Sequence, residues 1–264
     1  MRNMHFIVIV VAILLLGGVP ANAQRGGDAG DELRRRLFTT DSDVVLGTLQ
    51  ELAFEPSSEG ALAIGERIRF GLPMNLLLAA MDTLRAMQVA EAGPALVQLT
   101  QHRRSEIRLL AVQGLLACQP PGVERVLEVS LADSDPSVRS AAAAGLGQVG
   151  ASGAVSSLFL ALERGVLEAA VALGQVADES GIRRLLGYLG QVPFDSITPA
   201  LSEALVRRDL PMSLKLEVIG NLEELGTDEV RFYLEALGTN LTSSRDTPVR
   251  RAIESASVRL GGVR

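Results

Sequence analysis

The residues with the most suggestive chemical spacing are Gly145, Gly147 and Gly150, which spell the Gly-x-Gly-x-x-Gly fingerprint of dinucleotide-binding sites. In such a site the glycines follow a strand and open a helix, so that free amides at the helix start face the pyrophosphate. Here a helical, alanine-rich pattern precedes the glycines, and the glycines end it. Carbonyl groups rather than amides are free at a helix end, so we expect no cofactor at this motif.

Metal binding and nucleophilic catalysis have few candidate side chains. Beyond residue 23 the chain has one histidine, His102, and one cysteine, Cys118. This set provides neither a ligand cluster for zinc nor an activated nucleophile. Cys118 falls on an apolar helical stripe, so we expect a packed thiol that reacts slowly. His102 is expected near a helix end together with Arg103 and Arg104, where positive charge suits the terminal carbonyls.

Carboxylates form two neighbouring pairs, Glu223-Glu224 and Asp228-Glu229, on either side of a predicted turn. Acidic residues at helix starts and turns are usually solvated caps, so we expect no acid–base catalysis from them. The sequence also contains neither a Gly-x-Ser-x-Gly elbow nor a Ser-x-x-Lys motif. We therefore predict a protein that is not an enzyme and has no catalytic, cofactor-binding or metal-binding residues.

A repeating helical unit positions these residues. Asp135 can cap a helix start, and Pro136 suits the first turn because no amide bond is lost there. A stripe of apolar and small residues at helical spacing follows, ending at Gly150, and consists of Val138, Ala141, Ala142, Gly145, Leu146 and Val149. The same stripe recurs from Ile107 to Cys118 and from Leu76 to Met87, at two equal offsets. These equal offsets predict a series of similar helical units.

Shorter apolar segments lie between these helices and are separated from them by Gly, Pro, Asp or Ser. They cover residues 58–70, 91–101, 121–132, 152–163, 178–190, 197–208 and 227–238. The alternation predicts antiparallel helix pairs, which bury their apolar faces only when several pairs stack. The phase of the repeat is lost around residues 178–210, which predicts a bend or an inserted helix there.

The residues Asp135, Pro136, Val138, Arg139, Ala141, Ala142, Leu146 and Gly147 resemble a HEAT repeat, specifically the short type also seen in phycobilisome lyase-like proteins. The resemblance implies an all-α fold, namely a right-handed α-solenoid of about six HEAT-like antiparallel helix pairs over residues 41–260. It also implies that Arg108, Arg139 and Arg250, which share one register, support the fold by bonding to neighbouring turns. A related family, the deoxyhypusine hydroxylases, holds a di-iron centre with His-Glu pairs, which do not occur here.

Residues 1–23 have the pattern of a secretory signal peptide. Arg2 precedes an apolar run over residues 6–16, and Ala21-Asn22-Ala23 forms a small-x-small cleavage site. The run is too short to cross the roughly 30 Å hydrocarbon core of a membrane, so no stable membrane anchor is expected after cleavage. An uncleaved, membrane-tethered module remains the alternative. Residues 24–40 are expected to form a flexible lead-in and a first short helix.

Charge narrows the class of partner. The chain has 25 basic and 31 acidic residues, and removal of residues 1–23 changes the net charge from −6 to −7 because Arg2 is lost. An acidic, exported chain lacks the basic track that nucleic acid requires, so we expect no nucleic-acid partner. The arginine-rich composition is typical of a GC-rich bacterial genome. We therefore predict a bacterial protein located in the periplasm or secreted.

The resemblance implies that the second helices of the pairs line a concave face. The outward positions of these helices are expected to bind a partner, and they are Leu77, Met81, Leu109, Gln113, Leu116, Ser140, Ala144 and Gln148. Their apolar character has two interpretations: these side chains belong to the core, or they form a groove for a partner segment. The leading hypothesis is a non-enzymatic exported scaffold that binds a protein through this face. The alternative is a lyase-like or accessory enzyme that holds a small molecule in the same groove.

Overall fold

The computed structural model describes residues 30–240 and 247–261. The predicted signal peptide and residues 24–29 of the predicted lead-in lie outside this part of the chain. All regular secondary structure in the described residues is helical, so the predicted all-α fold is confirmed. No helix in these two ranges is long and apolar enough to cross a membrane.

Consecutive helices alternate between two rows, which we call the inner row and the outer row. The inner row consists of α2 (Ser42–Phe54), α4 (Met74–Met87), α6 (Ser105–Cys118), α8 (Pro136–Gln148), α10 (Glu168–Val176), α12 (Phe194–Val206) and α14 (Asp228–Asn240). The outer row consists of a helix over residues 30–37, α3 (Ser58–Phe70), α5 (Gly93–Leu99), α7 (Val123–Ser130), α9 (Val155–Glu163), α11 (Glu179–Leu186), α13 (Met212–Glu224) and α15 (Thr247–Gly261). Short 3-10 turns precede two outer helices, η1 (Ala90–Ala92) before α5 and η2 (Ser152–Ala154) before α9.

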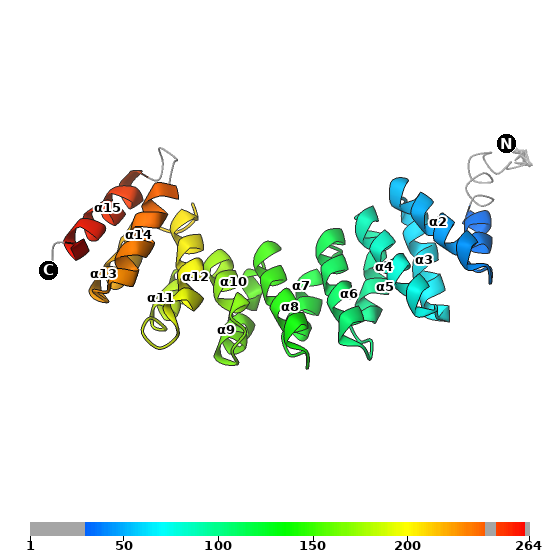
Figure 1. Cartoon of the computed structure of the whole chain (residues 1–264), viewed down its shortest axis with the longest axis horizontal. Coiled ribbons are helices and arrows are strands. Elements are labelled where there is room, and N and C mark those ends of the chain that lie inside the picture. The colour runs from blue at the N-terminus through cyan, green and yellow to red at the C-terminus, as the bar shows by residue number, and fades with distance from the viewer. Residues whose placement is uncertain (1–29, 241–246, 262–264) are drawn as a thin grey trace, which may run out of the picture.

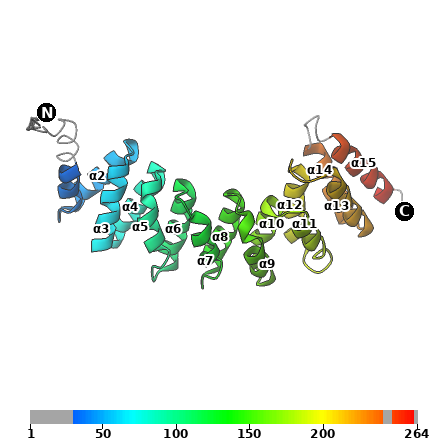
Figure 2. The same ribbon diagram turned by 180° about the vertical axis from the view of Figure 1, so that it is seen from behind.

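The two rows form an α-solenoid that bends into a shallow arc (Figure 1). The same arc is visible from behind, with α2 and α15 far apart at its two ends (Figure 2). Fully buried side chains fill the space between the rows along its whole length, among them Ile64, Leu84, Leu96, Ile107, Leu127, Leu146, Leu173 and Ile182. Because each helix pair contacts mainly its neighbours, the core is a continuous strip and not a single central cluster.

Local sequence signals explain where the helices begin and end. The Asp135 carboxylate accepts a hydrogen bond of 2.9 Å from the Ser137 amide, and Pro136 is the first residue of α8, as predicted. At the other end of α8, Gly150 adopts a positive φ of 70°, and the Ala151 amide donates to the Leu146 carbonyl over 2.9 Å. This bond satisfies a carbonyl at the helix end and confirms Gly150 as the stop.

Residues 178–210, where the phase of the repeat is lost, contain α11 and α12. α12 packs beside α10 in the inner row. The next helix with the hydrophobic-cation pair of the repeat, Leu214-Lys215 in α13, therefore falls in the outer row. Ion pairs of α13 with both neighbours in that row support this position: Arg183 of α11 with Glu217, and Glu223 with Arg259 of α15. The repeat signature thus changes rows after α10.

Candidate functional site

Glycine and alanine residues bring the inner helices into close contact. A Cβ atom on Gly174 of α10 would overlap the carbonyl oxygen of Ala200 in α12 and lie 2.8 Å from its Cα. One on Gly147 of α8 would lie 3.0 Å from the Cα of Ala172 in α10. Backbone therefore approaches backbone between α8, α10 and α12. The exposed sides of α8, α10 and α12 therefore lie side by side on one surface of the inner row.

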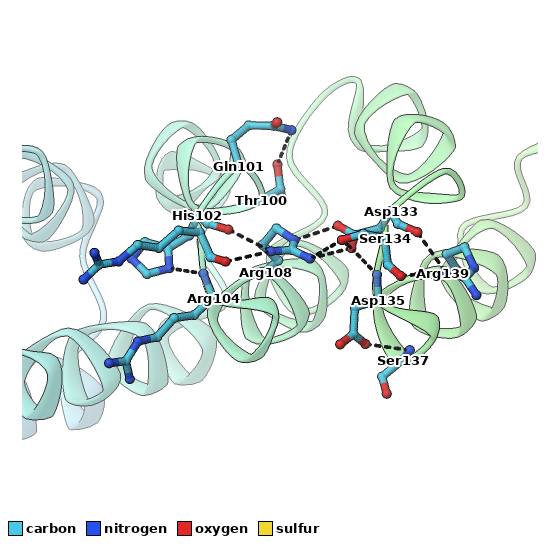
Figure 3. Close-up of polar contacts among 11 residues, drawn as sticks. Thr100, Gln101, His102, Arg104, Arg108, Asp133, Ser134, Asp135, Ser137 and Arg139 are labelled. Atoms are coloured by element: carbon cyan, nitrogen blue, oxygen red, sulfur yellow. Dashed lines mark hydrogen bonds and ion pairs between the residues drawn. The ribbon is translucent and has the colours of Figure 1, made fainter.

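An ion pair between two successive repeats fixes the loops beside this surface (Figure 3). The Arg108 guanidinium donates to both carboxylate oxygens of Asp133 over 2.7 and 2.6 Å, and the two side chains are only 12% and 10% exposed. This bidentate hydrogen bond holds the pKa of Asp133 below its ordinary value. The same carboxylate accepts the Asp135 amide over 2.8 Å, so Asp133 links Arg108 to the loop that begins α8.

Arginine at this register has the supporting role that the resemblance implies. Arg108 also donates to the carbonyls of His102 and Arg103, and Arg139 donates in the same way to those of Asp133 and Ser134, at 2.9 and 3.1 Å (Figure 3). Each guanidinium therefore ties the first turn of its helix to the loop before it.

Two later helices carry a cation at the equivalent position. In α13, Lys215 donates from Nζ to the Arg207 carbonyl. In α15, Arg250 lies 3.5 Å from Glu254 of the same helix. The residues that correspond to the carbonyl partners of Arg139 lie in 241–246 for this helix, outside the described residues.

The structure corrects part of the predicted partner-binding set. Leu77 and Met81 of α4 are only 7% and 3% exposed, so they belong to the core and do not form a surface. α4 lies between α2 and α6 in the inner row, and the register of one helix does not show how closely its neighbours pack on it.

The other six predicted positions lie on α6 and α8, next to each other in the inner row. Gln113 and Gln148 are exposed, and the partly exposed positions are Leu109, Leu116, Ser140 and Ala144. Leu116 also packs on Gly145, where a Cβ would approach its methyl group to 2.6 Å. The structure thus brings these six uncharged side chains together on one surface, which we call the inner patch, and Ser140 at its edge donates to the Glu168 carboxylate over 2.8 Å.

The remaining residues with chemical potential have structural roles. Gly145 and Gly147 lie in the last turns of α8 and permit close packing, so their spacing reflects helix contacts. His102 follows α5, and its Nδ1 accepts the Arg104 amide over 3.1 Å (Figure 3). The Cys118 thiol is buried, which raises its pKa, and Sγ donates to the Leu84 carbonyl. Its slow reaction with thiol reagents stays a prediction.

No group of three or more His, Cys, Asp or Glu side chains suited to a metal ion occurs within residues 30–240 and 247–261. The carboxylates singled out from the sequence also have structural contacts. Glu223 pairs with Arg259, which lowers the pKa of this carboxyl. Asp228 pairs with Arg231 one turn later, over 3.2 Å. The first contact joins α13 to α15, and the second lies within the first turn of α14.

The central part of the chain also matches a known family by sequence. Residues 93–174, which include α5 to α10, match the family described as HEAT repeats. The chain carries HEAT repeats. The matched segment contains the Arg108–Asp133 ion pair, the glycine contacts of α8 and the whole inner patch. The candidate surface is therefore built on the HEAT repeats themselves.

Solved structures with a similar arrangement include both enzymes and engineered proteins. Human deoxyhypusine hydroxylase, in complex with glycerol, is 17% identical, with 92% of this chain and 99% of that chain covered and a TM-score of 0.42. The CpcE–CpcF complex of phycocyanin lyase from Nostoc is 16% identical, with coverages of 94% and 100% and a TM-score of 0.46. An engineered protein is 18% identical, with coverages of 88% and 97% and a TM-score of 0.39. No curated protein matches the sequence.

Proposed function

We propose that this HEAT-repeat protein is a non-enzymatic scaffold that binds a protein segment along the inner patch of α6 and α8. The observation that carries the proposal is the absence of charge from these six neighbouring positions, on a chain with 25 basic and 31 acidic residues. The centres of protein interfaces are depleted of charged residues, whereas ordinary exposed surface is not. A strip of uncharged side chains on a solenoid, with one carboxylate at its edge, suits a partner segment that lies along it.

The two exposed amides suit this role. Gln113 and Gln148 each offer a side-chain donor and acceptor, and neither side-chain amide is hydrogen-bonded to any residue that the structure describes. The leucines and alanine beside them supply apolar contact. Together these groups can bond to the main chain of an extended segment and cover its apolar side chains.

Export from the cytoplasm is part of the proposal and rests on residues 1–23. The combination of an apolar run and the Ala21-Asn22-Ala23 site supports cleavage after Ala23. We expect the mature N-terminus to be Gln24 and the protein to be periplasmic or secreted. N-terminal sequencing of the protein from its own cells tests this, and a retained Met1 would support the membrane-tethered alternative.

Site-specific crosslinking in the native cells tests the binding surface. A photo-crosslinking residue replaces Gln113 or Gln148, and a control replaces exposed Arg164 after α9 of the outer row. We expect one protein to crosslink at both inner positions and not at residue 164. The proposal is wrong if no protein crosslinks at the inner positions, or if the same proteins crosslink at all three.

A small-molecule accessory enzyme is the second candidate, and a cleft at the C-terminal end favours it. The cleft lies between α14 and α15, has a volume of about 900 Å³ and is lined by Leu234, Ile253 and Ser257 among others. This volume is in the range of small-molecule sites. Native mass spectrometry of protein purified from its own cells tests it. A bound metabolite that is lost on Ser257→Tyr would favour the enzyme over the scaffold.

A further inference from the structure

The two rows of helices differ in charge, although both belong to one acidic chain. The helices of the outer row carry twelve acidic and twelve basic residues, so their charges balance. The helices of the inner row carry ten acidic and four basic residues. The excess negative charge of the helices therefore lies in the row that carries the inner patch.

The four basic residues of the inner helices already have partners. Arg85 and Arg231 pair with carboxylates of their own helices over 3.2 Å each. Arg108 and Arg139 donate to the loops that precede their helices. Most of the inner carboxylates, in contrast, have no ion pair with a residue in the described ranges. These are Asp43, Glu106, Glu168, Asp195, Glu203 and Glu229.

Three of these carboxylates lie next to the inner patch, on the following two inner helices. α10 packs on α8, and α12 packs on α10. Glu168 at the start of α10 accepts the hydroxyl of Ser140 over 2.8 Å. Asp195 and Glu203 lie four residues before and after exposed Pro199, so they share its solvent-exposed side of α12. The inner patch on α6 and α8 thus continues into a surface with three carboxylates on α10 and α12, which we call the acidic surface.

The cations nearest to the acidic surface lie in loops at its edges. Neither α10 nor α12 contains a basic residue. Arg164 precedes α10 and Arg208 follows α12, and both are exposed. Arg103 and Arg104 precede α6, at the other end of the inner patch, and Arg104 points away from α8 (Figure 3). Between the loops, the charged side chains of α10 and α12 are therefore all carboxylates.

We propose that the partner segment is basic at one end, with an uncharged part on the inner patch and lysine or arginine side chains over the acidic surface. This inference rests on the proposed function. Helices in contact lie about 8–10 Å apart, which three residues of an extended chain span at about 3.3 Å each. One basic residue therefore faces Glu168, and a second, three positions further on, faces the carboxylates of α12. Nucleic acid, an anionic membrane and a second copy of this acidic chain lack the complementary charge.

Fluorescence anisotropy with the purified chain and three labelled peptides tests the proposal. The basic probe has alternating leucine and serine over about six residues, followed by Lys-Ser-Ser-Lys. The uncharged probe has glutamine in place of both lysines, and the acidic probe has glutamate there. We expect the basic probe to bind about tenfold more tightly than the uncharged probe, and this advantage to fall below about threefold in about 1 M salt. The acidic probe should bind most weakly. No saturable binding of the basic probe, or equal binding of the three, would overturn the inference.

Matched double variants locate the basic end of the probe. We expect Glu168→Gln with Glu203→Gln to weaken binding of the basic probe about fivefold and to leave the uncharged probe unchanged. Glutamine keeps an acceptor for the Ser140 hydroxyl, so the contact between α8 and α10 is retained. The control is Glu91→Gln with Glu124→Gln, which removes the same charge from two exposed positions of the outer row and should change nothing. Equal losses for the two double variants would show an effect of net charge alone and would overturn the assignment.

Failure of this inference can be told apart from failure of the proposed function. Crosslinking from Gln113 and Gln148 decides whether a protein lies on the inner patch, whatever the charge of that protein. Mass spectrometry then identifies the crosslinked segment. A segment without lysine or arginine within about six residues of the crosslink would leave the scaffold function intact and overturn the basic end. A dimer in sedimentation velocity that Gln148→Arg dissociates would make a second copy the occupant and would also overturn it.

Discussion

The middle of the solenoid and its C-terminal end connect neighbouring helices by different means. Between α8, α10 and α12 the backbones touch at Gly147 and Gly174. Between α11, α13 and α15, charged side chains join the neighbours in addition to apolar packing, Arg183 with Glu217 and Arg259 with Glu223. Backbone contacts fix a helix spacing to within a methyl group, whereas long exposed side chains adjust at little cost. We therefore expect the helix spacing to change less in the middle than at the C-terminal end.

The position of the inner patch agrees with this difference. Gln113 and Gln148 lie on α6 and α8, and α8 has two glycines in close contact with its neighbours. A binding surface on helices of fixed spacing costs little ordering when a partner arrives. At the C-terminal end, where a cleft lies between α14 and α15, we expect the helix spacing to change more easily. The following substitutions test whether the two regions differ in this way.

The largest expected effect comes from Gly174→Ala in the middle. The added methyl group overlaps the Ala200 carbonyl, and this backbone atom cannot move aside as a side chain would. We expect the free energy of unfolding to fall by about 3 kcal/mol, measured by urea unfolding with circular dichroism. Gly220→Ala in α13 is the control, because a Cβ there meets no atom within 4 Å. Its helix should gain up to about 1 kcal/mol. Equal effects would contradict the difference between the regions.

Asp133→Ala is expected to have the next largest effect. It leaves the Arg108 guanidinium without its bidentate partner at a site where both side chains are nearly buried. We expect a loss of about 2 kcal/mol by the same measurement. The control at the C-terminal end is Glu235→Ala, which removes a carboxylate that is 48% exposed from Arg231. Because solvent screens that pair, its loss should stay below about 0.5 kcal/mol. A larger loss of stability for Glu235→Ala than for Asp133→Ala would contradict this expectation.

Much of the fold could be predicted from the sequence because its signals are local. The segment 58–70 corresponds to α3, and Asp135, Pro136 and Gly150 limit α8 as expected. These signals are side-chain caps, fixed backbone angles and apolar spacing, which act within one or two helical turns. The HEAT repeats were recognisable for the same reason.

Contacts between repeats could not be predicted in the same way. Burial of Leu77 and Met81 depends on how closely the neighbouring helices pack on α4, and the partner of Arg108 is a loop residue of the next repeat. The contact of Gly93 in α5 with Pro120 in the loop before α7 also joins two repeats. Glycine followed by proline before a short helix was the available signal, but it indicates a turn and does not reveal which residue the glycine meets.

A smaller effect is expected on the pH dependence of the unfolding free energy, which should also differ between the middle and the C-terminal end. Arg108 holds the pKa of Asp133 below its ordinary value, so the stability from this ion pair is complete above pH 4 or so and is lost as pH falls through the lowered pKa. Asp133→Asn should flatten the dependence of unfolding free energy on pH below about pH 4. Glu223→Gln should flatten it less, and that difference should disappear in about 1 M salt. If both variants flatten the pH dependence equally in low salt, the two ion pairs contribute equally to stability and the expected difference between the regions is wrong.

The smallest expected effect is that of Tyr233→Phe, at the junction of the two regions. The Tyr233 hydroxyl of α14 donates to the Thr198 carbonyl of α12 over 3.0 Å and lies 2.8 Å from the Ser202 hydroxyl. Burial raises its pKa to about 12, so the hydroxyl remains protonated in any ordinary buffer. Its loss should cost about 1 kcal/mol. Tyr188→Phe, which removes an exposed hydroxyl bonded to Glu163, is the control and should change stability by less than about 0.5 kcal/mol. A loss for Tyr233→Phe as large as that for Gly174→Ala would show that α12 and α14 are held as firmly as the middle of the solenoid. The boundary between the two regions would then lie beyond α14.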